Sequence, residues 1–164
     1  MLPDTHRRVL EQVLTALQGT DVAWALTGST SFALQGVNVL PNDIDIQTDE
    51  KAAYVIEGLL ARIPDSRIVR PVRYSESPSI RSHFGEMQIE GHKVEIMGAL
   101  QKRLASGDWE QPVDVAQLRV FVEWDPFLVP VLPLEYERQA YLLLGREDRA
   151  ELLAAFLKQR CTEG

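Results

Sequence analysis

Two short stretches of the chain decide its fold: residues 26–31 read LTGSTS, and residues 42–46 read NDIDI. The first follows the apolar run VAWAL at residues 22–26, which is typical of a buried strand, and a helix is expected to begin at Ser29. Such a turn leaves the first N–H groups of the helix free to bind phosphate, and Gly28 lets a ligand approach the backbone. An ordinary helix N-cap uses the same residue types, so this stretch alone leaves both interpretations open.

The second stretch places two aspartates on one face of a strand. Side chains alternate along a strand, so Asp43 and Asp45 share one face while Ile44 and Ile46 bury the other. Carboxylates at positions i and i+2 lie about 6.5 Å apart at Cα, close enough to bracket two divalent ions about 3.5–4 Å apart. The alternative is the polar face of a half-exposed strand, but Asp is rare in strands and like charges repel. The pattern therefore favours a metal-binding edge.

The spacing of the two stretches resembles a known signature. Gly28-Ser29, thirteen intervening residues and Asp43-Ile44-Asp45-Ile46 are similar to the pattern of the DNA polymerase beta-type nucleotidyltransferase superfamily. The chain resembles in particular its small bacterial members, which include antibiotic nucleotidyltransferases and toxin-type minimal nucleotidyltransferases. This resemblance implies that the Gly-Ser turn holds the triphosphate of a nucleotide. It also implies that the two aspartates hold two Mg²⁺ ions, and that a later strand supplies a third carboxylate.

The third carboxylate is expected at Glu95. Residues 81–89 and 92–97 read as two strands joined by a hairpin turn at residues 90–91. Glu95 stands between two apolar residues of the second strand, which matches the acidic strand of the family, although Asp is commoner there. By this resemblance Glu95 completes the metal site. The alternatives are a solvated strand residue or an ion-pair partner of Lys93.

Length and composition bound the class of protein. With 164 residues, 45% of them hydrophobic and 25% charged, the chain is expected to form a single domain. Within residues 1–164 we expect a catalytic α/β core at residues 1–132 and a helical pair at residues 133–160. The amino terminus lacks the apolar core of a signal peptide, and no apolar run approaches the roughly 20 residues of a membrane span, so a cytoplasmic location is expected. The single cysteine, Cys161, excludes an internal disulfide.

The net charge of −7 argues against a long nucleic-acid acceptor, because such partners usually need a basic surface. The end of a tRNA could still bind a local patch. The candidate patch consists of Arg67, Arg70, Arg73 and Arg81. In a regular strand Arg70 would face away from its neighbours in the patch unless Pro71 creates a bulge. A scattered, solvated strand face is therefore the favoured interpretation.

The periodicity of apolar residues predicts an α+β fold. We expect a mixed twisted sheet with helices mainly on one face, and a C-terminal helical pair packed on the sheet. This agrees with the nucleotidyltransferase fold that the resemblance implies. Helices are expected at residues 5–18, 29–36, 50–62, 134–144 and 146–159. Strands are expected at residues 22–26, 44–48, 68–74, 81–89, 92–97 and 118–124.

The acids and the resemblance together indicate an enzyme. It would be a Mg²⁺-dependent nucleotidyltransferase that moves a nucleoside monophosphate, with AMP favoured, from a nucleoside triphosphate to an acceptor hydroxyl. Asp43, Asp45 and Glu95 are the expected catalytic and metal-binding residues, with Mn²⁺ as the substitute ion. Gly28 and Ser29 are the expected nucleotide-binding residues.

The acceptor stays open at the level of sequence, since a small molecule such as an antibiotic, a tRNA and a protein hydroxyl all fit the same donor chemistry. Glu135 and Glu137 are candidates for a base that activates the acceptor, and Trp109 is a candidate acceptor contact. Two other classes of function are also compatible with the sequence. One is a catalytically silent protein of the same fold that acts through a protein partner, as in a toxin–antitoxin-like pair, or as a homodimer. The other is a nucleotide-binding sensor.

Overall fold

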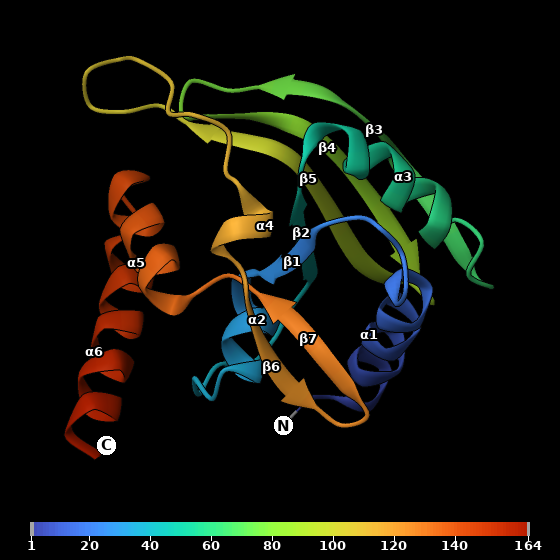
Figure 1. Cartoon of the computed structure of the whole chain (residues 1–164), viewed down its shortest axis with the longest axis horizontal. Helices are drawn as coiled ribbons and strands as arrows, with labels where there is room; N and C mark the ends of the chain where they lie inside the picture. Colours follow the sequence, from blue (N-terminus) through green and yellow to red (C-terminus); the bar gives the residue numbers. More distant parts are fainter. Residues whose placement is uncertain (1, 164) are drawn as a thin grey trace.

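The computed structural model describes residues 2–163, which contain a seven-stranded mixed sheet with the strand order β3-β4-β5-β2-β1-β7-β6 (Figure 1). The predicted α+β fold class is confirmed. The strands are β1 (Trp24–Thr27), β2 (Ile44–Thr48), β3 (Ser66–Glu76), β4 (Ile80–Ile89), β5 (His92–Lys102), β6 (Val120–Trp124) and β7 (Phe127–Val131). The helices are α1 (Asp4–Leu17), α2 (Gly28–Leu34), α3 (Glu50–Leu60), α4 (Val115–Leu118), α5 (Leu134–Leu143) and α6 (Glu147–Glu163). Among these described helices, none has the length and apolar character that crossing a membrane requires.

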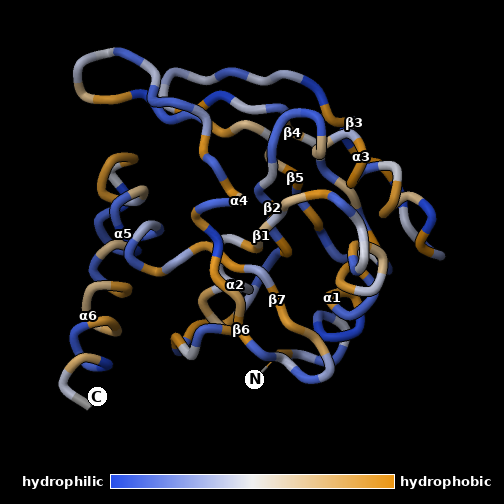
Figure 2. The backbone as a smooth tube through the Cα atoms, viewed as in Figure 1, coloured by the Kyte–Doolittle hydropathy of each residue, from blue (hydrophilic) through white to orange (hydrophobic). Residues whose placement is uncertain are grey.

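One face of the central strands forms the main core. β2 and β5 are parallel neighbours, and Ile44, Ile46, Val94 and Ile96 are fully buried on this face. Helices α1 and α3 cover it (Figure 1). Figure 2 shows apolar and polar residues alternating along α1, as expected for a helix with one side on the core. The opposite face of β2 and β5 is left for the polar residues between the buried positions.

Strand β7 was not among the predicted elements. It contains Pro130, and a proline within a short apolar run argues against a strand. The structure accommodates Pro130 because β1 pairs with β7 at Val131 alone among the described residues, whereas β6 pairs along the whole of β7. The strand expected at residues 118–124 begins later than predicted, because α4 includes Leu118.

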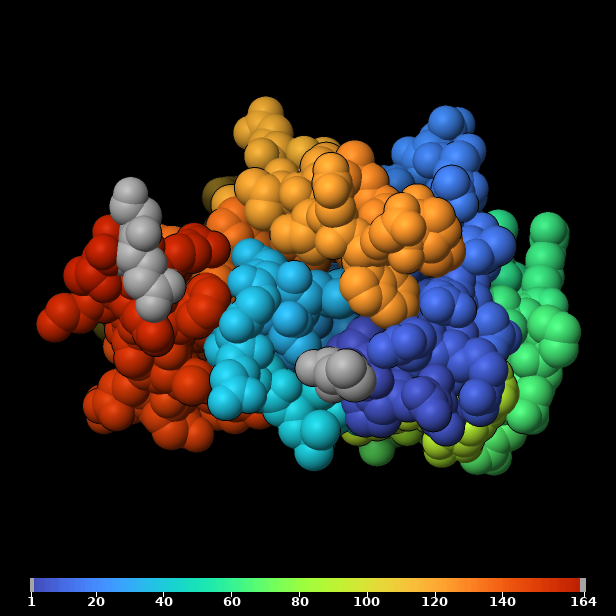
Figure 3. All heavy atoms as spheres, turned by 90° about the horizontal axis from the view of Figure 1, so that it is seen from below, coloured from blue at the N-terminus to red at the C-terminus, as the bar shows by residue number. Residues whose placement is uncertain are grey.

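The C-terminal helical pair packs on α2, and α5 also contacts the sheet, where the Thr27 hydroxyl of β1 donates a hydrogen bond to Glu137. The prediction that the pair packs on the sheet is therefore correct in part, for α5. Phe32 of α2 and Val37 just after it form a small core with Leu134 of α5 and Leu153 of α6. In Figure 3, residues of α2 and the loop that follows it lie between α6 and α1. Apolar residues at helical spacing define the side of a helix that is buried, but not the element that buries it.

Irregular pairing in β3 brings three arginines to one face of the sheet. The cross-strand pairs are Arg67 with Gln88, Arg70 with Glu86, and Arg73 with Phe84, with a register shift between each pair and the next. Their partners on β4 lie two residues apart and so share a face, and directly paired residues point the same way. Glu86 pairs in turn with Glu95 of β5, so this is also the face of the predicted acids. The bulge alternative is therefore correct, and the scattered strand face is wrong.

Candidate active site

Strand pairing brings the three predicted acids together. Asp45 of β2 lies directly opposite Glu95 of β5 in the parallel ladder, and paired residues project from the same face. Asp43 stands just before β2 begins. One carboxylate oxygen from each of the three residues lies within 4.8 Å of the others. The structure thus assembles an acid cluster, Asp43, Asp45 and Glu95, from positions up to 52 residues apart in the printed sequence.

The acid cluster carries negative charge that the protein only partly neutralises. Burial, and then the nearby Glu95 and Asp43 carboxylates, raise the pKa of Asp45 to about 7. Lys93 Nζ lies 2.9 Å from Glu95 Oε1 and 3.9 Å from Asp43 Oδ2. Glu95 therefore combines two of the roles weighed from the sequence, since it pairs with Lys93 and also joins the other acids. Three convergent carboxylates with one counter-charge are a donor set that fits hard divalent cations such as Mg²⁺.

The Gly-Ser turn lies against this cluster. Gly28 has a φ of +75°, and a Cβ added to it would lie 2.6 Å from Asp45 Oδ2. Both the backbone conformation and the close approach of the carboxylate therefore require glycine at this position. The first turn of α2 consequently begins beside the acid cluster.

Side-chain hydrogen bonds tie the two sequence motifs to each other. Ser29 Oγ accepts a hydrogen bond of 3.0 Å from the backbone N–H of Asn42. Thr30 Oγ1 donates one of 2.7 Å to the carbonyl of Asp43. The hydroxyl groups of the turn thus hold the loop that presents Asp43. The predicted phosphate contact of Ser29 stays a prediction, and the Ser29 hydroxyl keeps its own proton for such a contact.

The Ser29→Ala variant is expected to lose both stability and nucleotide affinity. Removing Oγ leaves the Asn42 N–H without its acceptor, which should lower the free energy of unfolding by about 1–3 kcal/mol. Urea denaturation and nucleotide titration would measure the two effects, with Ser106→Ala on an exposed loop as the control. Unchanged stability would show that the bond between Ser29 and Asn42 contributes nothing to the placement of Asp43.

A buried carboxylate approaches the turn from the other side. Glu137 of α5 is 4% exposed, accepts a hydrogen bond from the Thr27 hydroxyl and another from the Gly28 N–H, and has its pKa raised to about 7 by burial. Glu135, the other candidate base, is exposed and is held by Arg138. The structure therefore places Glu137 at the site and Glu135 outside it.

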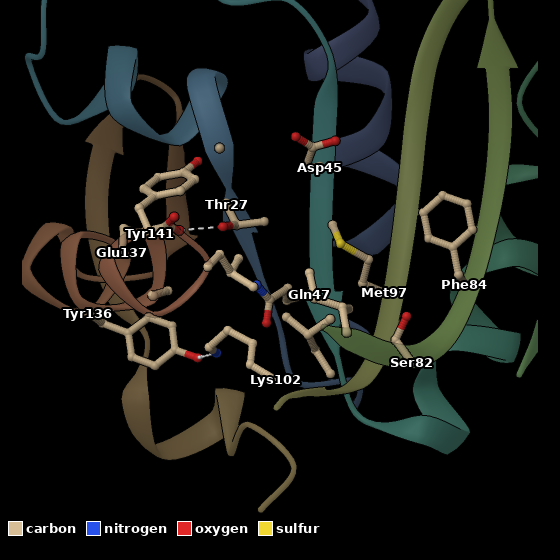
Figure 4. Close-up of a pocket in the computed structure, with 15 residues that line it drawn as sticks. Thr27, Asp45, Gln47, Ser82, Phe84, Met97, Lys102, Tyr136, Glu137 and Tyr141 are labelled. Carbon is tan, nitrogen blue, oxygen red and sulfur yellow. Dashed lines mark hydrogen bonds between the residues drawn. The ribbon is translucent and has the colours of Figure 1, made fainter. Parts of the chain in front are cut away.

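A cavity of about 300 Å³ lies between this face of the sheet and α5 (Figure 4). One end is lined by Thr27, Gly28, Asp45 and Glu137, so the cavity adjoins the acid cluster. Trp109, the acceptor contact expected from the sequence, is not among the residues that line it. Instead, the guanidinium carbons of Arg81 and Arg103 lie 4.5 and 4.6 Å from the centre of the Trp109 ring.

Sequence reasoning missed several residues that line the cavity. Gln47 could have been found, because it follows Asp45 by two residues on the same strand and so shares its face. For Lys102 and Tyr136, no local sequence pattern indicated that they would lie at the site. Their hydrogen bond of 3.1 Å joins residues 34 positions apart, and it depends on where α5 lies.

A helix that begins at a Gly-Ser turn beside three carboxylates on a mixed sheet is the arrangement of a nucleotidyltransferase. A family model described as aminoglycoside-2″-adenylyltransferase matches residues 9–155. The chain belongs to this family, and it is therefore an enzyme of the nucleotidyltransferase class. A search of curated proteins finds no match.

Solved structures agree with this assignment. A candidate nucleotidyltransferase from Thermotoga maritima is 48% identical, with 97% of this chain and 96% of that chain covered and a TM-score of 0.82. ANT(2″)-Ia, solved in complex with adenylyl-2″-tobramycin, is 13% identical, with 97% and 93% covered and a TM-score of 0.66. The lincosamide antibiotic adenylyltransferase LnuA, solved with lincomycin, is 14% identical, with 93% and 97% covered and a TM-score of 0.57. At such low identity these two antibiotic enzymes support the fold alone.

Proposed function

We propose that the protein is a Mg²⁺-dependent adenylyltransferase that moves AMP from ATP to a hydroxyl group of a small-molecule acceptor. The observation that carries the proposal is the convergence of Asp43, Asp45 and Glu95 beside Gly28, because it places three candidate metal ligands next to the candidate phosphate-binding turn. The family, described by its adenylyltransferase activity, supports AMP as the transferred group. It also favours a small acceptor over a tRNA or a protein. The expected cytoplasmic location is retained as part of the proposal.

The residues of the site divide the work between donor and acceptor. In the proposed arrangement Asp43 and Asp45 hold both metal ions, and Glu95 completes the coordination on the acceptor side. The first N–H groups of α2 and the Ser29 hydroxyl hold the β and γ phosphates. When bound, the two ions neutralise charge on the triphosphate and lower the pKa of the acceptor hydroxyl.

Glu137 is the carboxylate that we retain as the candidate base for the acceptor. It lines the cavity next to Asp45, and its pKa of about 7 lies close to an ordinary working pH, where a base functions best. Burial keeps bulk water away from this carboxylate, and the Thr27 hydroxyl and the Gly28 N–H fix its position.

Charge predicts how the ligands should bind. Three carboxylates contribute about −3, two Mg²⁺ ions +4 and a nucleoside triphosphate about −4, so nucleotide and metal each need the other. We expect ATP with Mg²⁺ to raise the melting temperature far more than either ligand does alone. Ligand at a hundredfold its dissociation constant should add about 2.7 kcal/mol to the free energy of unfolding.

Thermal melts with ATP, GTP, CTP and UTP, each with and without Mg²⁺, would measure this synergy. The Asp45→Asn variant is the control, because it should lose the synergy while remaining folded. Release of pyrophosphate on addition of a hydroxyl-bearing acceptor then separates a transferase from a nucleotide sensor or a silent protein. Absence of synergy with every nucleotide would contradict the proposed function.

A further inference from the structure

Gln47 has a buried side-chain oxygen without a hydrogen-bond partner among the described residues. It follows Asp45 by two residues on β2, so it projects from the same face, about 7 Å further along the strand. The residue is 6% exposed, and its Oε1 atom is buried with no hydrogen-bond partner. Buried polar atoms in folded proteins almost always have a partner, so a group like this one calls for an explanation such as a missing ligand.

The surroundings of Gln47 form a mostly apolar slot. Figure 4 shows the Gln47 carboxamide between the sheet and α5, with Met97 and Phe84 on the sheet side and Tyr136 and Tyr141 on the helix side. Aromatic and thioether side chains in such a slot suit a flat, apolar-faced ring.

Lys102, the cationic side chain that lines the same cavity, already has partners within the protein. Lys102 Nζ lies 2.7 Å from Glu110 Oε1 and 3.1 Å from the Tyr136 hydroxyl, and Lys102 is 3% exposed. The Gln47 carboxamide is therefore a group still available to recognise a ligand deep in the cavity.

The distribution of charge indicates which substrate occupies the slot. The acids that line the cavity, Asp45 and Glu137, stand at the end next to Gly28. Elsewhere the lining is apolar apart from Gln47, Ser82, the paired Lys102 and the hydroxyl groups of two tyrosines. A polycationic acceptor needs acids along its whole length. A nucleotide instead needs a polar end for its phosphates and an apolar slot for its base, and the cavity runs from the phosphate-binding turn towards Gln47.

We propose that this cavity is the base pocket of the donor nucleotide and that the Gln47 carboxamide selects adenine, an inference that rests on the proposed transfer from a nucleoside triphosphate. A carboxamide presents a hydrogen-bond acceptor beside a donor. Adenine presents the complementary pair, an exocyclic N–H beside a ring nitrogen, and glutamine reads this edge in nucleic acids as well. Guanine and uracil place a carbonyl oxygen where adenine has its amino group, so they lack the match on that edge. Cytosine has an amino group beside a ring nitrogen, as adenine has, so only its smaller ring distinguishes it from adenine in this slot.

Equilibrium binding of the four nucleoside triphosphates with Mg²⁺, measured by calorimetry without an acceptor, tests the inference. The wild-type protein should bind ATP about ten- to a hundredfold more tightly than GTP or UTP. Gln47→Leu should weaken ATP binding by a similar factor, leave UTP binding nearly unchanged and keep or raise the melting temperature. The matched control is Gln111→Leu, an exposed glutamine outside the cavity, which should bind all four nucleotides as the wild type does.

Three other outcomes would contradict the inference or the proposed function. If the wild type binds nucleotides with Mg²⁺ but Gln47→Leu keeps the same preference for ATP, the inference is overturned while the proposed function stands. If the wild type binds all four nucleotides with similar affinity, Gln47 selects no base and the inference is again overturned. If the wild type binds no nucleotide with Mg²⁺, the proposed function itself fails.

Discussion

Asp43→Asn and Asp45→Asn are expected to abolish nucleotidyl transfer while leaving the protein folded. Each change removes one proposed metal ligand from the acid cluster, and losing several kcal/mol of transition-state stabilisation lowers the rate by about a thousandfold or more. The same changes should leave the free energy of unfolding unchanged or raise it slightly. Because the three carboxylates repel one another in the metal-free protein, removing one charge relieves that repulsion.

The pH dependence of stability follows from Asp45. Its pKa is raised from 3.8 to about 7, so the folded state holds a proton that the unfolded state releases earlier. The contribution of Asp45 to stability is therefore fully present below about pH 4 and is lost as the pH rises towards 7. An asparagine does not titrate, so Asp45→Asn should be more stable than the wild type at pH 8 by about 1–3 kcal/mol and should lose this advantage near pH 4.

Urea denaturation of the metal-free protein at the two pH values, together with pyrophosphate release at saturating ATP and Mg²⁺, would measure both effects. Asp108→Asn, on an exposed loop, provides the control for a change of charge away from the site. A variant that unfolds at pH 8 would show that the acids hold the structure together, and the metal-site assignment would then lose its physical basis.

Gly28→Val should eliminate nucleotide binding. The side chain would have to adopt a φ of +75° and its Cβ would meet Asp45 Oδ2 at 2.6 Å, so either the turn or the carboxylate must move. A left-handed conformation alone costs about 1–2 kcal/mol for a residue with a Cβ. The displacement of Asp45 adds the loss of the proposed metal site, and we therefore expect an ATP affinity too weak to measure.

Gly19→Ala separates backbone strain from the loss of the site. Gly19 has the same φ of +75°, but nothing lies within 4 Å of a Cβ added there. The Gly19→Ala variant should therefore lose stability and keep its nucleotide affinity, whereas Gly28→Ala should lose both. Normal ATP binding by Gly28→Val would mean that the phosphate cradle lies elsewhere in the protein.

Local patterns were enough to predict the parts of the site that lie within one strand or one turn. The alternation of Asp43 and Asp45 with isoleucines predicted β2 at residues 44–48, and the hairpin turn before His92 placed Glu95 on its strand. That Glu95 lies directly opposite Asp45 depends on the parallel register of β2 and β5. The family resemblance implied a third carboxylate on a later strand, but neither it nor local periodicity gave this register.

Features that depend on distant partners were beyond the reach of the sequence. The position of the helical pair follows from its contact with Phe32, and the common face of Arg67, Arg70 and Arg73 follows from register shifts in β3. Neither leaves a periodic signal in the residues themselves. Strand β7 was missed because Pro130 is a strong local argument against a strand, and the pairing that tolerates it becomes visible only in the sheet.

The hydrogen bonds from Thr27 and Gly28 to Glu137 join helix α5, in the last third of the chain, to the Gly-Ser turn in the first third. The acids and the turn belong to the sheet, but the wall that faces them, with Glu137, Tyr136 and Tyr141, belongs to α5. A hybrid that exchanges α5 and α6 between two relatives would keep the reacting edge and replace that wall. We therefore expect such a hybrid to change which ligand the cavity admits, and to stay active only where the new helix keeps a carboxylate at the position of Glu137.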